Sequence, residues 1–231
     1  MDSLGQRLAE IESRISAAAI AENRLREDIE LIVVSKNHPF TMAVDLLNLG
    51  VRSLGENRDQ EAKPKSLEVA EAMSDSKIDY KWHFIGQLQS NKVRSALSYA
   101  SVVHSLDRAS LLEALIRVTD EQLKPRDVFI QLNLTQDESR GGIEPKNLVS
   151  FAEKVLQAKN LNLLGVMGVA SLDKEPQVDF ATILEASNQL VKLEPRAKFI
   201  SAGMSEDFEI AIGFGATHLR IGSAITGKRA I

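Results

Sequence analysis

The chain has no cysteine among its 231 residues. Disulfide bonds, thiolate metal sites, iron–sulfur clusters and cysteine nucleophiles are therefore excluded together. The sequence also lacks an apolar run that approaches the length of a membrane span. Its first 30 residues scatter acids and bases instead of forming the apolar centre of a signal peptide. These absences predict a cytoplasmic protein that does not contact membranes.

A strong excess of charge of one sign is lacking as well. The sequence has 28 Lys and Arg against 32 Asp and Glu, which gives a net charge of -4 at pH 7. Because a nucleic-acid-binding domain normally carries a basic excess, this balance predicts no nucleic-acid partner. No histidines or carboxylates have the spacing of metal ligands, so we expect no metal site. With 44% hydrophobic residues, the chain has enough apolar material to form a single domain over residues 1–231.

Short apolar runs alternate with helical patterns along the whole chain. The runs that we interpret as strands lie at residues 31–36, 51–55, 82–86, 101–105, 127–134, 161–167, 198–201 and 217–221. Alternation of strands and helices is typical of a parallel sheet, and eight repeats in this length predict a (β/α)8 TIM barrel. An extra helix is expected at residues 3–26, Gly50 should end the helix after the first strand, and Asp107 should cap a later one. An open doubly wound sheet fits less well, because no Gly-x-Gly-x-x-Gly motif follows the first strand.

Lys36 ends the first apolar run and is followed by Asn37-His38-Pro39. Strand alternation places Ile32, Val34 and Lys36 on one face. An amine at the mouth of an apolar interior is partly desolvated, which favours its neutral form and leaves a lone pair for a carbonyl. We therefore interpret Lys36 as a candidate for Schiff-base chemistry. The alternative is that Lys36 simply ends the strand and extends its ammonium group into water.

Two glycine- and serine-bearing loops follow the seventh and eighth runs, at residues 201–205 and 222–224. In barrels of this class the active site lies at the carboxyl ends of the strands, and these two loops often bind a phosphate. The alternative is helix capping by Ser205 and ordinary turn glycines. A lysine and a phosphate site at the same mouth indicate a phosphorylated aldehyde, either a sugar phosphate or pyridoxal 5'-phosphate.

Three further polar residues lie near the predicted mouth. A guanidinium stays protonated, so Arg220 beside a pyridine nitrogen would keep that nitrogen unprotonated and make the cofactor a weaker electron sink. Arg220 could instead form a salt bridge between strand and loop. Asn57 could donate its amide to a ring hydroxyl or belong to an ordinary turn. His83 could pack near a flat ligand or be a core histidine.

At these residues the sequence resembles the pyridoxal phosphate homeostasis protein family, the YggS/PROSC-like proteins. The similar blocks, of which the third is the most specific, are Val34 to Lys36, Gly55 to Asn57, Trp82 to Lys92, Gly203 to Ser205 and Arg220 to Ile225. The resemblance implies a fold-type III barrel similar to the N-terminal domain of alanine racemase. It implies that Lys36 holds pyridoxal 5'-phosphate as an internal aldimine, with Arg220 facing the pyridine nitrogen. The further cofactor-binding residues that it implies are Asn57 and His83 at the ring, Ser201, Gly203, Ser205, Gly222 and Ser223 around the phosphate, and Met204 beside them.

The tyrosines of the chain bear on whether the protein is a cofactor carrier or an enzyme. Racemisation needs an acid or base on each face of the α-carbon, and in the racemases resembled here one is a tyrosine of a second domain. This chain has only Tyr80 and Tyr99, both in early elements, and it ends at Ile231. We therefore expect a monomer that buffers or delivers the cofactor in vitamin B6 homeostasis without strong catalysis. The alternative is a single-domain racemase-like enzyme in which Lys36 shuttles protons.

Partners other than pyridoxal 5'-phosphate are expected to be proteins. Apoenzymes that use this cofactor, or a regulatory protein, are the partner classes that we consider. The polar loop from Thr135 to Gly142 is a candidate contact for such a protein.

Overall fold

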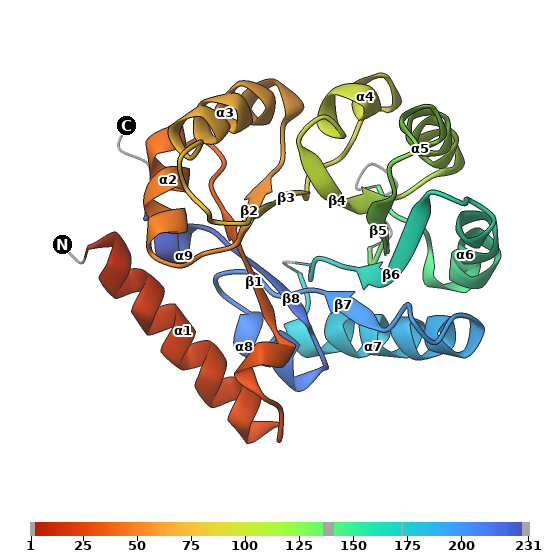
Figure 1. The fold of residues 1–231 in the computed structure, drawn as a ribbon. Helices are drawn as coiled ribbons and strands as arrows, with labels where there is room; N and C mark the ends of the chain where they lie inside the picture. Colours follow the sequence, from red (N-terminus) through yellow and green to blue (C-terminus); the bar gives the residue numbers. More distant parts are fainter. Residues whose placement is uncertain (1–2, 136–140, 172, 228–231) are drawn as a thin grey trace.

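The computed structural model describes residues 3–135, 141–171 and 173–227. Within them, eight parallel strands form a closed barrel in chain order, and β8 pairs with β1 (Figure 1). The strands are β1 (Glu30–Val34), β2 (Ser53–Glu56), β3 (Lys81–Phe84), β4 (Ala100–Leu106), β5 (Arg126–Gln131), β6 (Leu161–Met167), β7 (Phe199–Ser201) and β8 (His218–Ile221). The predicted (β/α)8 barrel is confirmed.

Helices surround the barrel on its outside (Figure 1). They are α1 (Leu4–Ala21), α2 (Phe40–Asn48), α3 (Asp59–Ala72), α4 (Val93–Ala96), α5 (Ala109–Gln122), α6 (Leu148–Leu156), α7 (Pro176–Leu193), α8 (Phe208–Gly213) and α9 (Ser223–Thr226). Short 3-10 helices lie at η1 (Arg26–Asp28), η2 (Ser90–Lys92) and η4 (Pro145–Asn147). The extra N-terminal helix α1 packs against α8 and α9, where Arg14 forms an ion pair of 2.6 Å with Glu209.

The strands bury side chains on both faces. On β1, Leu31 and Val33 belong to the large core between barrel and helices. A Cβ on Gly55 would lie 3.0 and 3.3 Å from methyl groups of Ile32 and Val34, so these two side chains point the other way, into the barrel. The predicted alternation is confirmed from Leu31 to Val34, and burial on both faces explains why these four residues are apolar.

The first strand ends earlier than we expected. β1 stops at Val34, and Lys36 and Asn37 form a turn closed by a 3.1 Å hydrogen bond from the His38 amide to the Ser35 carbonyl. Asn37 adopts the left-handed conformation, with φ of 63°. Lys36 lies in this turn and is exposed. The expectation of a partly desolvated amine that forms a Schiff base stays a prediction.

Predictions for the helix ends have mixed outcomes. Gly50 follows α2 with φ of 101°, which confirms that it ends this helix. Helix α1 is shorter than predicted, because the chain turns at Asn23 with φ of 54°. Arg108, not Asp107, occupies the N-cap of α5, and the carboxylate of Asp107 instead forms an ion pair with the Arg108 guanidinium.

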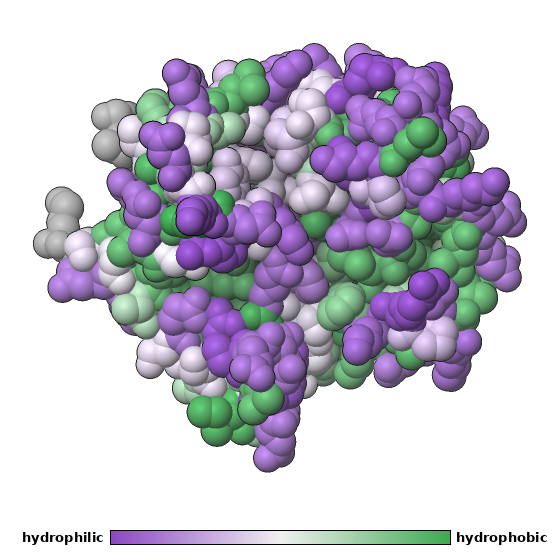
Figure 2. Space-filling view, in the orientation of Figure 1, coloured by the Kyte–Doolittle hydropathy of each residue, from purple (hydrophilic) through white to green (hydrophobic). Residues whose placement is uncertain are grey.

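The outer surface is polar over most of the visible face, with hydrophobic residues in small groups between the polar ones (Figure 2). Among the described residues, no helix has both the length and the apolar character needed to cross a membrane.

Candidate functional site

The carboxyl ends of the strands form one mouth of the barrel, and several predicted site residues meet there. In the β1–β8 pairing, Ile32 lies opposite Arg220 and Val33 opposite Ile221. A Cβ on Gly222 would lie 3.5 Å from the carbonyl oxygen of Val34. The loop after β8 therefore runs beside the end of β1, two residues before Lys36. Parallel pairing thus brings the predicted Schiff-base lysine and the predicted phosphate loop together.

The two loops after β7 and β8 are linked by serine hydroxyls. The Ser205 hydroxyl lies 3.4 Å from both the Ser223 hydroxyl and the Ala224 amide nitrogen. Gly203 adopts φ of 91°, and a Cβ there would approach Ala211 to 2.9 Å, so only glycine fits this turn. These contacts place hydroxyl groups and an N–H group on one side of the mouth. Met204, the remaining predicted residue of this loop, is 37% exposed.

Arg220 is a buried cation at the same mouth. It is 4% exposed, and it donates hydrogen bonds of 2.6 Å to the Ser201 hydroxyl and 2.8 Å to the Gly168 carbonyl. Burial lowers the pKa of Arg220 to about 10, although Asp207 partly opposes this shift. The guanidinium therefore keeps its charge at neutral pH while its described hydrogen bonds go to neutral oxygens.

A histidine network fills the barrel interior below Arg220. His83 Nδ1 lies 2.9 Å from His104 Nε2, and His104 Nδ1 lies 2.8 Å from the Ser201 hydroxyl oxygen. At the opposite end of the barrel, Glu30 contacts His83 Nε2 at 3.3 Å and His218 Nε2 at 3.1 Å. His83 thus points into the barrel, as the sequence suggested, but it is 1% exposed and lies below the mouth.

Burial dominates the electrostatics of this network. Burial lowers the pKa of His83 and lowers that of His104 further, so both rings are neutral at neutral pH. Burial alone would raise the pKa of Glu30, but contacts with His218, His83 and the Ser53 hydroxyl lower it overall. The barrel interior therefore has a cation at one end, an anion at the other, and neutral rings between them.

A second buried cluster lies on the helix side of the same strands. Lys65 of α3 donates to the Glu56 carboxylate at 2.6 Å and to the Ser35 carbonyl at 2.8 Å. The Ser35 hydroxyl donates to the same Glu56 oxygen at 2.8 Å. Because Ser35 directly precedes Lys36, this cluster fixes the backbone from which Lys36 extends.

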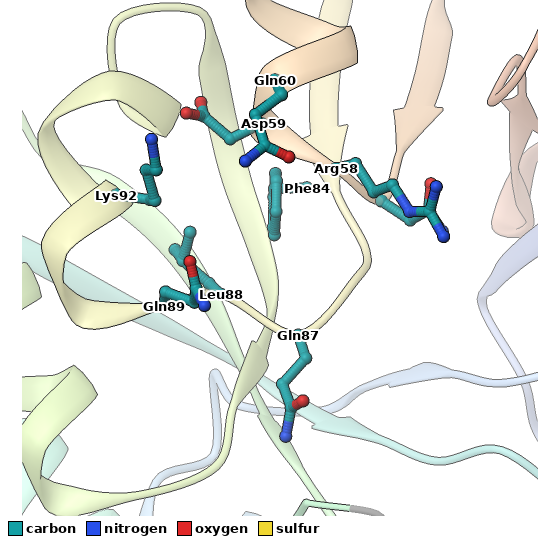
Figure 3. A pocket seen from close by; sticks show the side chains of 9 residues that line it. Arg58, Asp59, Gln60, Phe84, Gln87, Leu88, Gln89 and Lys92 are labelled. Atoms are coloured by element: carbon teal, nitrogen blue, oxygen red, sulfur yellow. The ribbon is translucent and has the colours of Figure 1, made fainter.

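A cavity of about 270 Å³ lies beside the mouth, where β2 and β3 end. Most of it is lined by the turn after β2 and by the most specific of the sequence blocks (Figure 3). In this view Arg58 and Lys92 lie on opposite sides of the Phe84 ring. A Cβ on Gly86 would lie 2.1 Å from the carbonyl oxygen of Asn57, so Gly86 allows the two strand ends to touch. The predicted ring-binding residue Asn57 is thereby held at the edge of the mouth.

Comparisons with known proteins agree with this architecture. The family model described as the alanine racemase N-terminal domain matches residues 11–230. A pyridoxal phosphate homeostasis protein of Mycobacterium leprae is 38% identical over 232 residues, which cover 95% of this chain and 90% of that protein. Its Escherichia coli counterpart is 33% identical over 232 residues, covering 99% and 98%. The chain belongs to the pyridoxal phosphate homeostasis protein family.

Solved structures give the same result. PipY of Synechococcus elongatus, solved with PLP bound, is 30% identical with a TM-score of 0.82, covering 97% of this chain and 100% of that one. Alanine racemase of Corynebacterium glutamicum is 13% identical with a TM-score of 0.69, and the match covers 98% of this chain but 62% of the racemase. The racemase therefore shows the fold alone. The family resemblance inferred from the sequence is confirmed.

The structure does not bring every predicted residue to one place. Ser201 is fully buried, and its hydroxyl contacts Arg220 and His104, below the two serine-bearing loops. The phosphate role of Ser201 and the ring-lining role of His83 remain predictions. Residues 136–140 of the candidate partner loop lie outside the described part of the chain.

Sequence reasoning missed the two networks that hold these residues. The sequence did contain a signal for His104. It lies two residues after Val102 and therefore on the same face of the strand, where a single polar residue among apolar ones indicates an interior polar contact. No comparable signal exists for Lys65, which reaches Glu56 from a helix nine positions later.

Proposed function

We propose that the chain binds pyridoxal 5'-phosphate at the barrel mouth and buffers or delivers it in vitamin B6 homeostasis. The main support for this proposal is the environment of Arg220, which is a buried cation whose hydrogen bonds go to neutral oxygens at the mouth where the serine-bearing loops lie. The curated relatives' name and the PLP bound to PipY support this ligand. We further propose a single domain over residues 1–231, acting as a cytoplasmic monomer that serves apoenzymes using this cofactor or a regulatory protein.

The residues at the mouth fit such a ligand. Pyridoxal 5'-phosphate supplies an aldehyde that reacts with a primary amine to give a Schiff base. Lys36 offers that amine from the turn beside Gly222, and its exposure leaves it accessible to an entering ligand. The Ser205 and Ser223 hydroxyls would hold the phosphate, because hydroxyl and N–H donors at a helix start favour anions. Arg220 would donate to the pyridine nitrogen and keep it unprotonated.

The positions of the tyrosines support a carrier over a racemase-like enzyme. The Tyr99 hydroxyl donates to Asp59 at 3.4 Å, and its ring packs edge-on against Trp82 on the outer side of the barrel. Tyr80 precedes β3 and packs against the outer core. Burial raises the pKa of both phenols, which disfavours the phenolate that a racemase base requires. Both tyrosines pack with the outer core, which supports a carrier.

The test compares Lys36→Ala with Lys63→Ala, a matched variant because both lysines are exposed. Wild-type protein and Lys63→Ala should show a visible absorbance band after addition of pyridoxal 5'-phosphate, and borohydride should fix the cofactor to Lys36, as mass spectrometry of peptides would show. Lys36→Ala should lack the band. A colourless wild type that takes up no cofactor would overturn the proposal and favour a phosphorylated sugar.

The same proteins decide between carrier and enzyme. We expect no sustained turnover when cofactor-loaded wild type is incubated with free amino acids and their enantiomers are separated. Sustained racemisation that disappears in Lys36→Ala would establish the racemase-like alternative instead.

A further inference from the structure

A continuous line of polar groups crosses the barrel interior from the mouth to the opposite end. Its members in order are Arg220, Ser201, His104, His83 and Glu30. The three links between Arg220 and His83 are 2.6, 2.8 and 2.9 Å long. The His104 ring also stacks on Phe129, with ring centroids 4.6 Å apart, and this contact restricts its rotation. Side chains from β1, β3, β4, β7 and β8 therefore form one connected path.

The proton positions along this line follow from its two ends. Arg220 can only donate, so the Ser201 oxygen accepts from it. Ser201 is fully buried, and among the described contacts His104 Nδ1 is the one acceptor within reach of its proton, so we direct that proton to His104 Nδ1. A neutral His104 that accepts at Nδ1 carries its proton on Nε2 and donates to His83 Nδ1. His83 then carries its proton on Nε2, toward the Glu30 carboxylate. Each group accepts on its mouth side and donates on the other.

The contact between His83 and Glu30 is the weakest link. Its length is 3.3 Å, and the His83 Nε2 proton is not aligned as a hydrogen bond. An unprotonated Nε2 would nevertheless direct a lone pair at a carboxylate, which is repulsive. Glu30 therefore selects the same tautomer of His83 that Arg220 requires from the other end. Among the described residues, no cluster of three or more His, Asp or Glu side chains is arranged to hold a metal ion, which would be the other use of such a group.

We propose that Glu30, His83 and His104 are positioning residues that lock both histidines as Nε2-protonated tautomers and thereby fix Ser201 as an acceptor for Arg220. In this relay the Ser201 proton is committed to His104, so Ser201 orients the guanidinium instead of donating to a ligand. The hydrogen bonds to Ser201 and Gly168 use two of the five guanidinium N–H groups. The role of Arg220 toward a bound ligand rests on the proposed function, whereas the relay itself needs no ligand.

The test is long-range ¹H–¹⁵N NMR of the histidine rings in wild-type protein without added cofactor, near pH 7.5. Protonated and unprotonated ring nitrogens have distinct ¹⁵N shifts, so the spectrum reports each tautomer directly. We expect protonated Nε2 and unprotonated Nδ1 in both His83 and His104. A protonated Nδ1 on either ring, or an imidazolium, would overturn the relay. The groups that face His104 in this measurement are His83, His218, Arg220 and Glu30.

Two variants test the ends of the relay. Glu30→Gln removes the charge that selects the His83 tautomer, so the ratio of its Nε2-H to Nδ1-H forms should fall by about tenfold or more. Ser201→Ala should release His104 Nδ1 in the same way. The matched control is Glu12→Gln, because Glu12 lines the same end pocket as Glu30 but pairs with Arg26. Unchanged ratios in both Glu30→Gln and Ser201→Ala would overturn the proposal.

The outcomes of this test are independent of cofactor uptake. If the protein shows the predicted tautomers but takes up no pyridoxal 5'-phosphate, the relay is supported and only the proposed function is contradicted. The opposite tautomers in a protein whose Lys36 is labelled would overturn the relay alone.

Discussion

Two buried cations lie near the same mouth of the barrel, and they are held in different ways. Lys65 is 7% exposed and donates directly to the Glu56 carboxylate at 2.6 Å. Arg220 is 4% exposed and donates only to the Ser201 hydroxyl and the Gly168 carbonyl among its described side-chain contacts, while the charge of Asp207 acts on it without a described hydrogen bond or ion pair. Lys65 therefore has its counter-ion in contact, whereas Arg220 retains attraction for an electron-rich atom of a ligand.

The difference separates a structural charge from a binding charge. Removing an ion from water costs several kcal/mol, and a direct counter-ion offsets most of this penalty. A polarised relay offsets less, because Coulomb attraction falls with distance. We therefore expect the Glu56–Lys65 pair to depend on both partners for stability. Arg220 should instead contribute little to stability in the free protein and gain its partner on binding.

The largest expected effect is that of Lys65→Met. This change leaves the buried Glu56 carboxylate without its cation, so the free energy of unfolding should fall by about 3–5 kcal/mol. Urea unfolding followed by circular dichroism measures it. In the double variant Glu56→Gln/Lys65→Met, most of the loss should be recovered, because no unpaired charge remains. A loss of less than about 1 kcal/mol in Lys65→Met would show that the pair is not structural.

Arg220→Met is the matched comparison, because the same side chain replaces a cation of similar burial. It leaves only a hydroxyl and a carbonyl without a donor, so we expect a loss of about 0–2 kcal/mol in the free protein. Retention of pyridoxal 5'-phosphate should fall at least about tenfold, because a charge-assisted hydrogen bond is lost. A stability loss equal to that of Lys65→Met would remove the distinction between the two cations.

The strands and one helix end, which depend on local sequence patterns, were predictable from the sequence. The pattern of apolar runs gave all eight strands, and β6 was predicted with both ends correct at Leu161 and Met167. The turn at Gly50 was predictable because a helix end needs a residue that tolerates positive φ. These features depend on local spacing and on backbone conformation.

The parts that depend on contacts between distant strands were not predictable. Lys36 is exposed in a turn in which Asn37 takes a positive φ, and the predicted strand was too long because β1 ends at Val34. The Glu56–Lys65 pair and the path from Glu30 to Arg220 depend on barrel closure, which periodicity does not report. The sequence thus predicted several of the residues that lie at the mouth, but not the partners that hold them.

The pH dependence of stability distinguishes the histidine network from the Glu56–Lys65 cluster. The expected change in free energy is smaller than that of Lys65→Met. Burial, with smaller contributions from His83, Arg220 and His218, lowers the pKa of His104 well below its ordinary value. The unfolded chain takes up a proton near pH 6.5, whereas the folded chain does not, so stability falls as the pH decreases. Between about pH 7.5 and about pH 5.5, His104 alone should account for about 1 kcal/mol.

Urea unfolding at several pH values measures this slope in wild type, His104→Phe and Glu56→Gln/Lys65→Met. The double variant should keep the wild-type slope, because it leaves no titrating group at the pair, whereas Lys65→Met alone would leave a buried carboxyl that takes up a proton in the folded state. His104→Phe should have a shallower slope, although its stability at neutral pH also falls through lost hydrogen bonds. Equal slopes in wild type and His104→Phe would contradict a neutral His104 in the folded protein.

The smallest expected effect is that of Arg58→Met, which completes the series of cations replaced by methionine. Arg58 Nη1 lies 3.4 Å from Glu61 Oε1, and the two side chains are 65% and 35% exposed. Water screens this pair, so the free energy of unfolding should change by less than about 0.5 kcal/mol. Urea unfolding in low salt and in about 1 M salt checks this, since screening should remove what remains. A loss of stability as large as that of Lys65→Met would mean that burial does not explain why the Glu56–Lys65 pair stabilises the protein more than the Arg58–Glu61 pair. The difference between Lys65 and Arg220 would then need another cause.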